Sequence, residues 1–329
     1  MIVTGSFKSI FCCIYSKKTF VYLMLMTALF LSPLVLVVNG VSVVSDIVVG
    51  NEAELLNAIN VAPNKKSYVI GISDDIVLKN SLEIPKNKNI TLVKDGGTSS
   101  FVSLIGCDGV DTIIVKSSGK LVLLDGVVVS HAKGDSGRGI YIENKGTFIL
   151  NGGEISGNRV NDFDGGGGVY NQGVFKMLSG KISDNTAFFD GDYNISCGGG
   201  VYNIGNFEMS GGVISDNAAR FGGGVCNHAD GSFVMSDGEI TRNTALYGGG
   251  VEYSVGTVKG TVTLSGGKIF NNTATNGSGY SPDLSIMCAD GWSPARLFVP
   301  LSIISVAIVV VVCVLLFYRA KRRKKALIL

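Results

Sequence analysis

Four aspartates in two glycine-containing stretches are the residues best suited to chemistry. Asp162 and Asp164 lie in the stretch NDFDGG, and Asp190 and Asp192 lie in FFDGDY. Paired carboxylates can act as acid and base on a glycosidic bond, or can hold a calcium ion beside a basic residue. The alternative is that both stretches are solvated turns, because Asp-Gly is common in turns. Neither stretch contains an Arg or Lys that could serve as a base. Neither matches the EF-hand loop or the GGxGxD nonapeptide. We therefore treat the four aspartates as candidate Ca²⁺ ligands and assign no catalytic residue and no other cofactor.

The cysteines predict no metal cluster, because the four that would face the exterior are widely scattered and form no CxxC motif. They can pair in an oxidising compartment, but the sequence leaves their connectivity open. These four are Cys107, Cys197, Cys226 and Cys288.

A repeated pattern must position these residues. Six segments begin at a glycine and share apolar residues two, four and nine positions later, with a second glycine seven positions later. Twelve positions after the first glycine stands a histidine once and then asparagine five times. The starting glycines are Gly119, Gly146, Gly173, Gly205, Gly231 and Gly260, and the twelfth positions are His131, Asn158, Asn185, Asn217, Asn243 and Asn272. Successive segments start 26 to 32 residues apart.

This period predicts a solenoid, in which each unit buries its apolar face against its neighbours. The apolar residues alternate within a unit, which is the pattern of a strand with one face inward. Glycine at this density would break the long helices of a helical solenoid, and the LxxLxL pattern of leucine-rich repeats is missing. The sequence therefore predicts an all-β fold, a parallel β-helix with coils about 4.8 Å apart.

Within one coil, we expect Phe207, Met209 and Ile214 to fill the interior. Glycines 205, 211 and 212 should form corners with positive φ. Asn217 should occupy a corner in the left-handed conformation and bond to the asparagine of the next coil. A second asparagine column should follow the GGGV(Y/C) strand at Asn171, Asn203 and Asn227.

The two histidines cannot form a catalytic pair, because His131 and His228 lie about four coils, or roughly 20 Å, apart. His131 stands in the asparagine column, which favours a corner hydrogen bond. Tyr170 and Tyr202 should stack as a small aromatic strip able to hold a sugar or a partner.

The two ends of the solenoid region differ in pattern. Residues 41–80 are expected to form an N-terminal cap, in which 51–60 is a short amphipathic helix with Asn51 as N-cap and Glu54 completing a capping box. Leu55, Leu56 and Ile59 should share its buried face. Residues 81–280 are expected to be the β-helix. Length changes are confined to the segment between the asparagine column and the next glycine triplet, where loops of solenoids usually bind partners.

Apolar segments flank this region. Residues 1–40 are predicted to be a signal peptide or signal anchor, and 281–296 a juxtamembrane linker. Leu297–Tyr318 is long enough to cross a membrane, and the basic residues of 319–329 should stay in the cytoplasm. The sequence thus predicts a single-pass protein of the cell membrane with its large domain outside.

The charge of that domain argues against a nucleic-acid partner. Nine of the 28 Lys and Arg residues lie in 1–40 and 297–329, so residues 41–296 hold 19 basic against 26 acidic residues, a net charge of −7. A phosphate-binding face needs the opposite sign.

The repeated wording GGGVYN…GxFxMxGGxIsxN over residues 137–275 resembles the right-handed parallel β-helix proteins of the pectin-lyase-like class. It is most similar to the passengers of polymorphic outer membrane proteins and to adhesin-like surface proteins of archaea and bacteria. The resemblance implies an extracellular, often adhesive solenoid. An autotransporter would end in an outer-membrane domain, whereas this chain ends in one apolar segment, so a single-membrane surface is favoured.

Three functions follow as hypotheses. The favoured one is a membrane-anchored, non-catalytic, adhesin-like protein that binds a cell-surface glycan or protein. The second is a tethered polysaccharide lyase or hydrolase that uses the acidic loops 162–164 and 190–192, which requires the four aspartates to gather around a cleft with a basic residue. The third is a structural envelope spacer.

Overall fold

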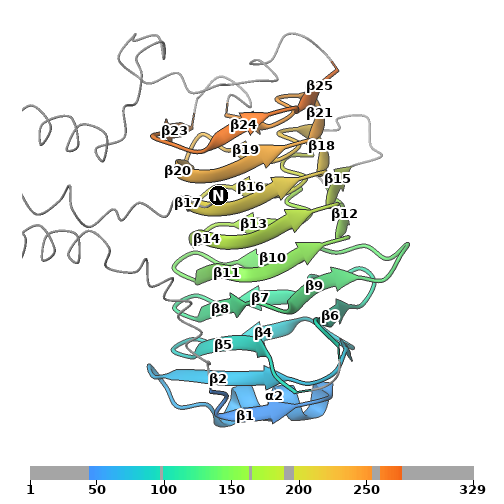
Figure 1. Cartoon of the computed structure of the whole chain (residues 1–329), viewed down its shortest axis with the longest axis vertical. Coiled ribbons are helices and arrows are strands. Elements are labelled where there is room, and N and C mark those ends of the chain that lie inside the picture. The colour runs from blue at the N-terminus through green and yellow to red at the C-terminus, as the bar shows by residue number, and fades with distance from the viewer. Residues whose placement is uncertain (1–43, 97–98, 163–164, 189–195, 254–259, 276–329) are drawn as a thin grey trace, which may run out of the picture. The chain divides into compact units, whose positions relative to one another are not determined.

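The computed structural model describes residues 44–96, 99–162, 165–188, 196–253 and 260–275. Within these residues the chain winds into an all-β parallel solenoid that contains one helix, as the repeat predicts (Figure 1). Equivalent strands of successive coils pair in parallel. The coil therefore places residues with the same repeat position beside one another.

Three sheets, named here A, B and C, run along the solenoid. Sheet B has seven short strands, which are β4 (Leu82–Ile84), β7 (Ile113–Val115), β10 (Ile140–Ile142), β13 (Val169–Asn171), β16 (Val201–Asn203), β19 (Val225–Asn227) and β22 (Val251–Glu252). Sheet C has five, which are β12 (Arg159–Asn161), β15 (Thr186–Phe188), β18 (Ala218–Phe221), β21 (Thr244–Tyr247) and β25 (Thr273–Ala274).

Sheet A has thirteen strands and provides most of the core. They are β1 (Ile47–Val49), β2 (Ser67–Ile72), β3 (Ile76–Val77), β5 (Asn89–Lys94), β6 (Val102–Gly106), β8 (Lys120–Leu124), β9 (Val127–His131), β11 (Thr147–Ser156), β14 (Val174–Ser183), β17 (Asn206–Ser215), β20 (Ser232–Thr241), β23 (Thr261–Leu264) and β24 (Lys268–Phe270). Each central coil runs from sheet B through a ten-residue strand of sheet A to sheet C, and a variable loop leads back to sheet B.

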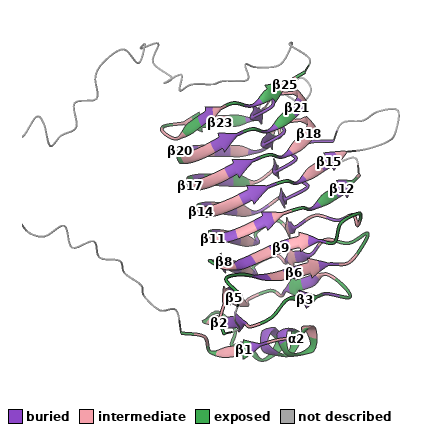
Figure 2. Cartoon of the chain, turned by 45° about the vertical axis from the view of Figure 1, so that its right-hand side comes forward, coloured by how far each residue is buried: buried purple, intermediate pink, exposed green. Residues whose placement is uncertain are grey.

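The interior is a continuous stack of buried apolar side chains, and buried positions recur along the strands of successive coils (Figure 2). Phe148, Phe175, Phe207 and Phe233 are fully buried and pair in register. Neighbouring rings are nearly parallel, with centroids 5.2, 4.5 and 4.8 Å apart along the column. The predicted interior is therefore confirmed.

The glycines at the bends have two different physical roles. Gly212 has a φ of +84°, so its positive φ is confirmed, and it lies inside β17 rather than between two strands. The positive φ expected at Gly205 and Gly211 is wrong, because the residues with positive φ do not include them. At Gly205 a Cβ atom would lie 2.3 Å from the Gly173 carbonyl oxygen of the preceding coil. This glycine is needed for close approach of two backbones.

Helix α2 (Glu52–Val61) lies beside β1 at the first coil. The Asn51 side chain accepts a hydrogen bond from the Glu54 backbone at 3.1 Å, as predicted, and the Glu54 carboxylate accepts one from Gly50. Leu55 and Ile59 are buried, but Leu56 is 46% exposed, so the expectation for Leu56 is wrong. Leu56 follows Leu55 by one helical step of about 100°, which turns its side chain away from the buried face of the helix. Residues 41–80 also contain β1, β2 and β3, which pair within sheet A.

The predicted segments 1–40, 281–296, 297–318 and 319–329 lie outside the described residues. Within the described ranges, no helix has the length and apolar character needed to cross a membrane.

Candidate functional site

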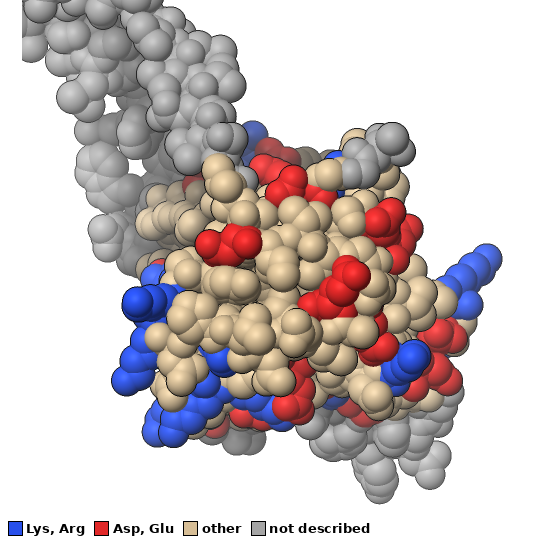
Figure 3. Space-filling model, turned by 90° about the horizontal axis from the view of Figure 1, so that it is seen from below, with Lys and Arg blue, Asp and Glu red and all other residues tan. Residues whose placement is uncertain are grey.

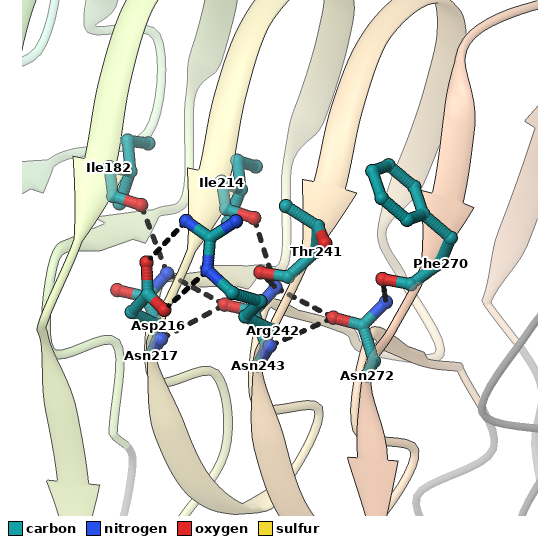
Figure 4. A network of polar contacts seen from close by, with 9 residues as sticks. All are labelled: Ile182, Ile214, Asp216, Asn217, Thr241, Arg242, Asn243, Phe270 and Asn272. Atoms are coloured by element: carbon teal, nitrogen blue, oxygen red, sulfur yellow. Dashed lines mark hydrogen bonds and ion pairs between the residues drawn. The ribbon is translucent and has the colours of Figure 1, made fainter.

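A buried asparagine ladder fixes the corner from which sheet C departs (Figure 4). The Asn217 side-chain oxygen accepts from the Asn185 amide nitrogen at 3.0 Å and from its backbone nitrogen at 3.1 Å. The Asn217 amide donates to Asn243 at 2.9 Å and to the Ile182 carbonyl at 3.0 Å. The same bonds link Asn158 to Asn185 and Asn243 to Asn272. The predicted ladder is confirmed.

The left-handed residue at this corner is the one before the ladder asparagine, so the conformation predicted for Asn217 is wrong. Asp216 has a φ of 60° and Arg242 a φ of 57°. Placing the bend one residue earlier turns the asparagine side chain inward. Asp216 and Arg242 then lie on the surface of successive coils and form two 2.8 Å hydrogen bonds (Figure 4). The Arg242 guanidinium lowers the pKa of Asp216.

The second asparagine column and His131 also hold corners, as predicted. Asn171 donates to Asn203 at 2.7 Å, and Asn203 donates to Asn227 at 2.6 Å. His131 is buried, and its Nδ1 lies 2.9 Å from the Asn158 side-chain oxygen. Its Nε2 lies 2.9 Å from the Val110 carbonyl. Both ring nitrogens therefore have structural partners.

Among the four candidate aspartates, the structure describes only Asp162, while Asp164, Asp190 and Asp192 lie outside the described residues. Asp162 forms an ion pair with Arg138, and it accepts a hydrogen bond from the Gly165 backbone at 2.8 Å. Arg138 also contacts Asp111 at 3.3 Å and donates to the Gly165 carbonyl at 2.8 Å. That the four carboxylates lie close together stays a prediction. The Asp162 carboxylate itself is paired with the Arg138 guanidinium.

Sequence reasoning missed Arg138. A signal was present, because Arg138 stands where the next coils have the middle glycine of their GGG triplet, as the pairing of Ile140 with Val169 shows. At this repeat position Arg138 has a long charged side chain, whereas the glycines of the next coils let the backbones approach closely. The guanidinium carbon of Arg138 lies 4.9 Å from the centre of the Tyr170 ring. The geometry matches a structural clamp between two coils.

The tyrosine strip exists but offers little surface to a ligand. The rings of Tyr141, Tyr170 and Tyr202 follow one another edge to face at 5.2 and 5.3 Å. Tyr170 is only 6% exposed and Tyr202 only 9%, because they share a small cluster with Cys197 and Cys226. The expected sugar-binding face on these two rings is therefore not open.

The same cluster predicts a difference in thiol reactivity. Burial raises the pKa of the Cys226 thiol well above its ordinary value, and the neighbouring Cys197 thiol adds to the effect. Because the thiolate is the nucleophile, we expect iodoacetamide to modify Cys226 at least about tenfold more slowly than half-buried Cys107. Peptide mapping of reduced, native protein by mass spectrometry measures both rates, and denatured protein is the control. Equal rates in the native protein would contradict the buried cluster.

Charged side chains elsewhere form pairs between coils. Lys116 bridges Glu83 at 3.0 Å and Glu143 at 3.2 Å. Its hydrogen bond to Glu83 raises the pKa of Lys116, and the Ser117 backbone lowers the pKa of Glu143. Seen from the end that carries α2, the surface shows both signs of charge, with basic side chains gathered along one side (Figure 3). Such pairs contribute about 0–1 kcal/mol each.

The outer surface of sheet C has an open groove of about 360 Å³. Two other hollows of similar size lie beside α2, with about 320 Å³, and around Phe101 and β9, with about 370 Å³. Phe188, Arg220 and Leu246 of three successive coils line the groove on sheet C, together with Thr186 and small alanines. The Arg159 guanidinium lies 4.0 Å from the centre of the Phe188 ring. Sequence reasoning placed a binding face at the variable loops but did not single out these side chains, because they lie outside the six repeated positions.

No group of three His, Cys, Asp or Glu side chains among the described residues could hold a metal ion. The comparisons add no function: no family model, no curated protein and no solved structure matches the chain. The candidate functional site is thus the groove on sheet C, argued from its own geometry.

Proposed function

We propose that the chain is a membrane-anchored surface protein of the right-handed, pectin-lyase-like β-helix kind, with adhesin-like binding of a glycan or protein and no catalysis. The signal segment 1–40, the span 297–318 and the basic tail support this topology through their sequence alone. The repeat wording supports the likeness to polymorphic outer membrane proteins and adhesin-like proteins.

The observation that carries the proposal is the position of the groove. The loops that lead from sheet C back to sheet B vary in length, as do the connections from sheet B to sheet A, and the groove lies on sheet C across three coils. A rigid stack that presents an open groove beside variable loops suits recognition of an extended ligand, because the scaffold keeps its form while the loops differ.

The lyase or hydrolase remains the second candidate. Its best support is that Asp162 has a basic neighbour, Arg138, from the preceding coil. That guanidinium also contacts Asp111 and the Gly165 carbonyl, so it is held by protein groups rather than presented to a substrate. This arrangement favours a positioning role for Arg138 over that of a catalytic base.

A binding screen tests the proposal. Full-length protein purified in detergent should bind at least one glycan on a broad array or one type of cell. A spacer should bind neither. Incubation with the bound polysaccharide should release no new reducing ends or unsaturated products. Cleavage that is lost in Asp162→Asn, with the thermal midpoint unchanged, would replace the adhesin-like proposal by the enzyme.

A further inference from the structure

We propose that Cys197 and Cys226 form a disulfide bond that links two successive coils of the solenoid. The inference rests on the proposed surface location for its oxidant, because disulfides form and persist in the oxidising environment outside the cell.

Two columns of residues, one on each side of the GGG triplets, bring the cysteines together. In the column before the triplets, Cys197 pairs with Gly165 of the preceding coil and with Phe221 of the next. In the column after the triplets, Tyr202 pairs with Cys226. Each column thus holds one of the two cysteines, and these two stand in neighbouring coils.

The tight bend at the triplet closes the gap between the columns. A Cβ atom on Gly222 would lie 2.7 Å from the Cα atom of Cys226, so the chain folds back within four residues. The Cys226 thiol is hydrogen-bonded to the Cys197 thiol and to the Gly198 backbone. Contact between the two thiols suits a disulfide, which requires Cα atoms no more than about 7 Å apart.

Cys107, the other cysteine in the described ranges, lies too far away to pair with either. It precedes β7, whereas Cys197 precedes β16, and sheet B places β10 and β13 between these two strands. Three coils at about 4.8 Å each separate the cysteines by about 14 Å, which is twice the reach of a disulfide.

Burial decides when the bond can form. Both residues are thiols in the structure, Cys197 is only 3% exposed, and Cys226 is fully buried in a cluster with Tyr170 and Tyr202. A dissolved oxidant cannot reach these sulfur atoms in the closed solenoid. The bond should therefore form while the coils close during folding, and the finished fold should protect it from reductants.

Two thiol–disulfide exchanges form the bond. The thiolate of one cysteine attacks the disulfide of the oxidant, which is glutathione disulfide or the disulfide of an oxidoreductase, and a mixed disulfide forms as one thiol leaves. The thiolate of the second cysteine attacks this mixed disulfide, and the second thiol leaves. The cysteine pair loses two electrons and two protons, and the oxidant is reduced to two thiols.

The bond would support the longest connection between the ladder and a triplet. Twelve residues separate Asn185 from Gly198, against four between Asn217 and Gly222. Cys197 is the last residue of the longer connection. A disulfide there would tie the end of this insertion to the next coil.

Peptide mapping without reduction tests the pairing. The full-length protein is extracted in detergent with N-ethylmaleimide, unfolded in the same reagent to block every remaining thiol, and digested with trypsin. Cleavage at Arg220 separates the two cysteines. We expect the Cys197 and Cys226 peptides to be joined in nearly every molecule, with a mass lower by two hydrogen atoms than the sum of the two thiol peptides.

Variants in a Cys107→Ala background give a second readout. Cys107→Ala alone should keep the joined peptides, and dithiothreitol should lower its urea midpoint by about 1 M, because reduction frees the unfolded chain. Adding Cys226→Ala should expose the Cys197 thiol to N-ethylmaleimide in the unfolded protein and remove the effect of dithiothreitol on the midpoint.

Refolding separates failure of the pairing from failure of the proposed location. Reduced protein unfolded in urea is refolded in detergent with glutathione disulfide, which supplies the oxidant directly. Joined peptides after refolding, but blocked thiols in protein taken from cells, would support the pairing and contradict the surface location. Separate peptides in both samples, or a link from either cysteine to Cys288, would overturn this inference and leave the adhesin-like proposal intact.

Discussion

Replacing Asn217 by alanine is expected to lower the free energy of unfolding by about 2–5 kcal/mol. The side chain is 1% exposed and links the coils before and after it. Its loss removes the acceptor of two Asn185 nitrogens and the donor to the Ile182 carbonyl. These groups are buried, so water cannot replace the lost partner without opening the corner. A urea titration of the full-length protein, followed by circular dichroism, measures the change.

Asn206→Ala in the same coil is the control. Asn206 is exposed, and its hydrogen bonds to Gly173 and Asn171 use its backbone nitrogen and carbonyl, which alanine keeps. We expect a change within about 0.5 kcal/mol. If Asn217→Ala lowers the free energy of unfolding no more than this control does, the ladder does not stabilise the corner. The groove on sheet C, which follows this corner, would then lack that support.

Replacing Phe207 by alanine is expected to lower the free energy of unfolding by about 3–5 kcal/mol. The ring is fully buried between Phe175 and Phe233, at centroid distances of 4.5 and 4.8 Å. The in-register backbones of the coils on either side keep the site from collapsing, so truncation leaves a cavity and removes two stacked contacts. The same urea titration measures the loss.

Two further variants make this result specific. Phe207→Leu keeps an apolar side chain of smaller volume and should cost less than the alanine variant, about 1–3 kcal/mol, so the effect stays measurable even if the alanine variant fails to fold. Phe101→Ala removes a ring that is 54% exposed and should change stability by less than about 1 kcal/mol. Equal losses at Phe101 and Phe207 would contradict a continuous aromatic core.

Together these expectations connect the core to function. The groove on sheet C uses side chains from three coils, β15, β18 and β21. Their relative positions depend on the backbone pairing between coils, which the phenylalanine column supports from inside and the asparagine ladder supports at the corner. A variant that loosens either column should therefore weaken ligand binding as well as stability, without touching the groove.

The amino-acid sequence by itself determined the architecture and the interior of this protein. Residues at equal repeat positions must meet when strands pair in register, so the phenylalanine column, the two asparagine columns and the place of His131 followed from spacing alone. The membrane topology and the adhesin-like assignment also come from sequence and stand as predictions. Helix α2 was predictable from its cap, although the exposure of Leu56 shows that pattern alone misjudged its buried face.

Only the tertiary structure decided what lies outside the repeat. It brought Arg138 to Asp162 across 24 residues and left Arg220 without a carboxylate partner in the described ranges. It also covered Tyr170 and Tyr202, and it moved the left-handed corner one residue ahead of Asn217. The physical reason is that inward positions carry similar apolar or asparagine residues in every coil, whereas outward positions pair in the same register but carry different residues from one coil to the next.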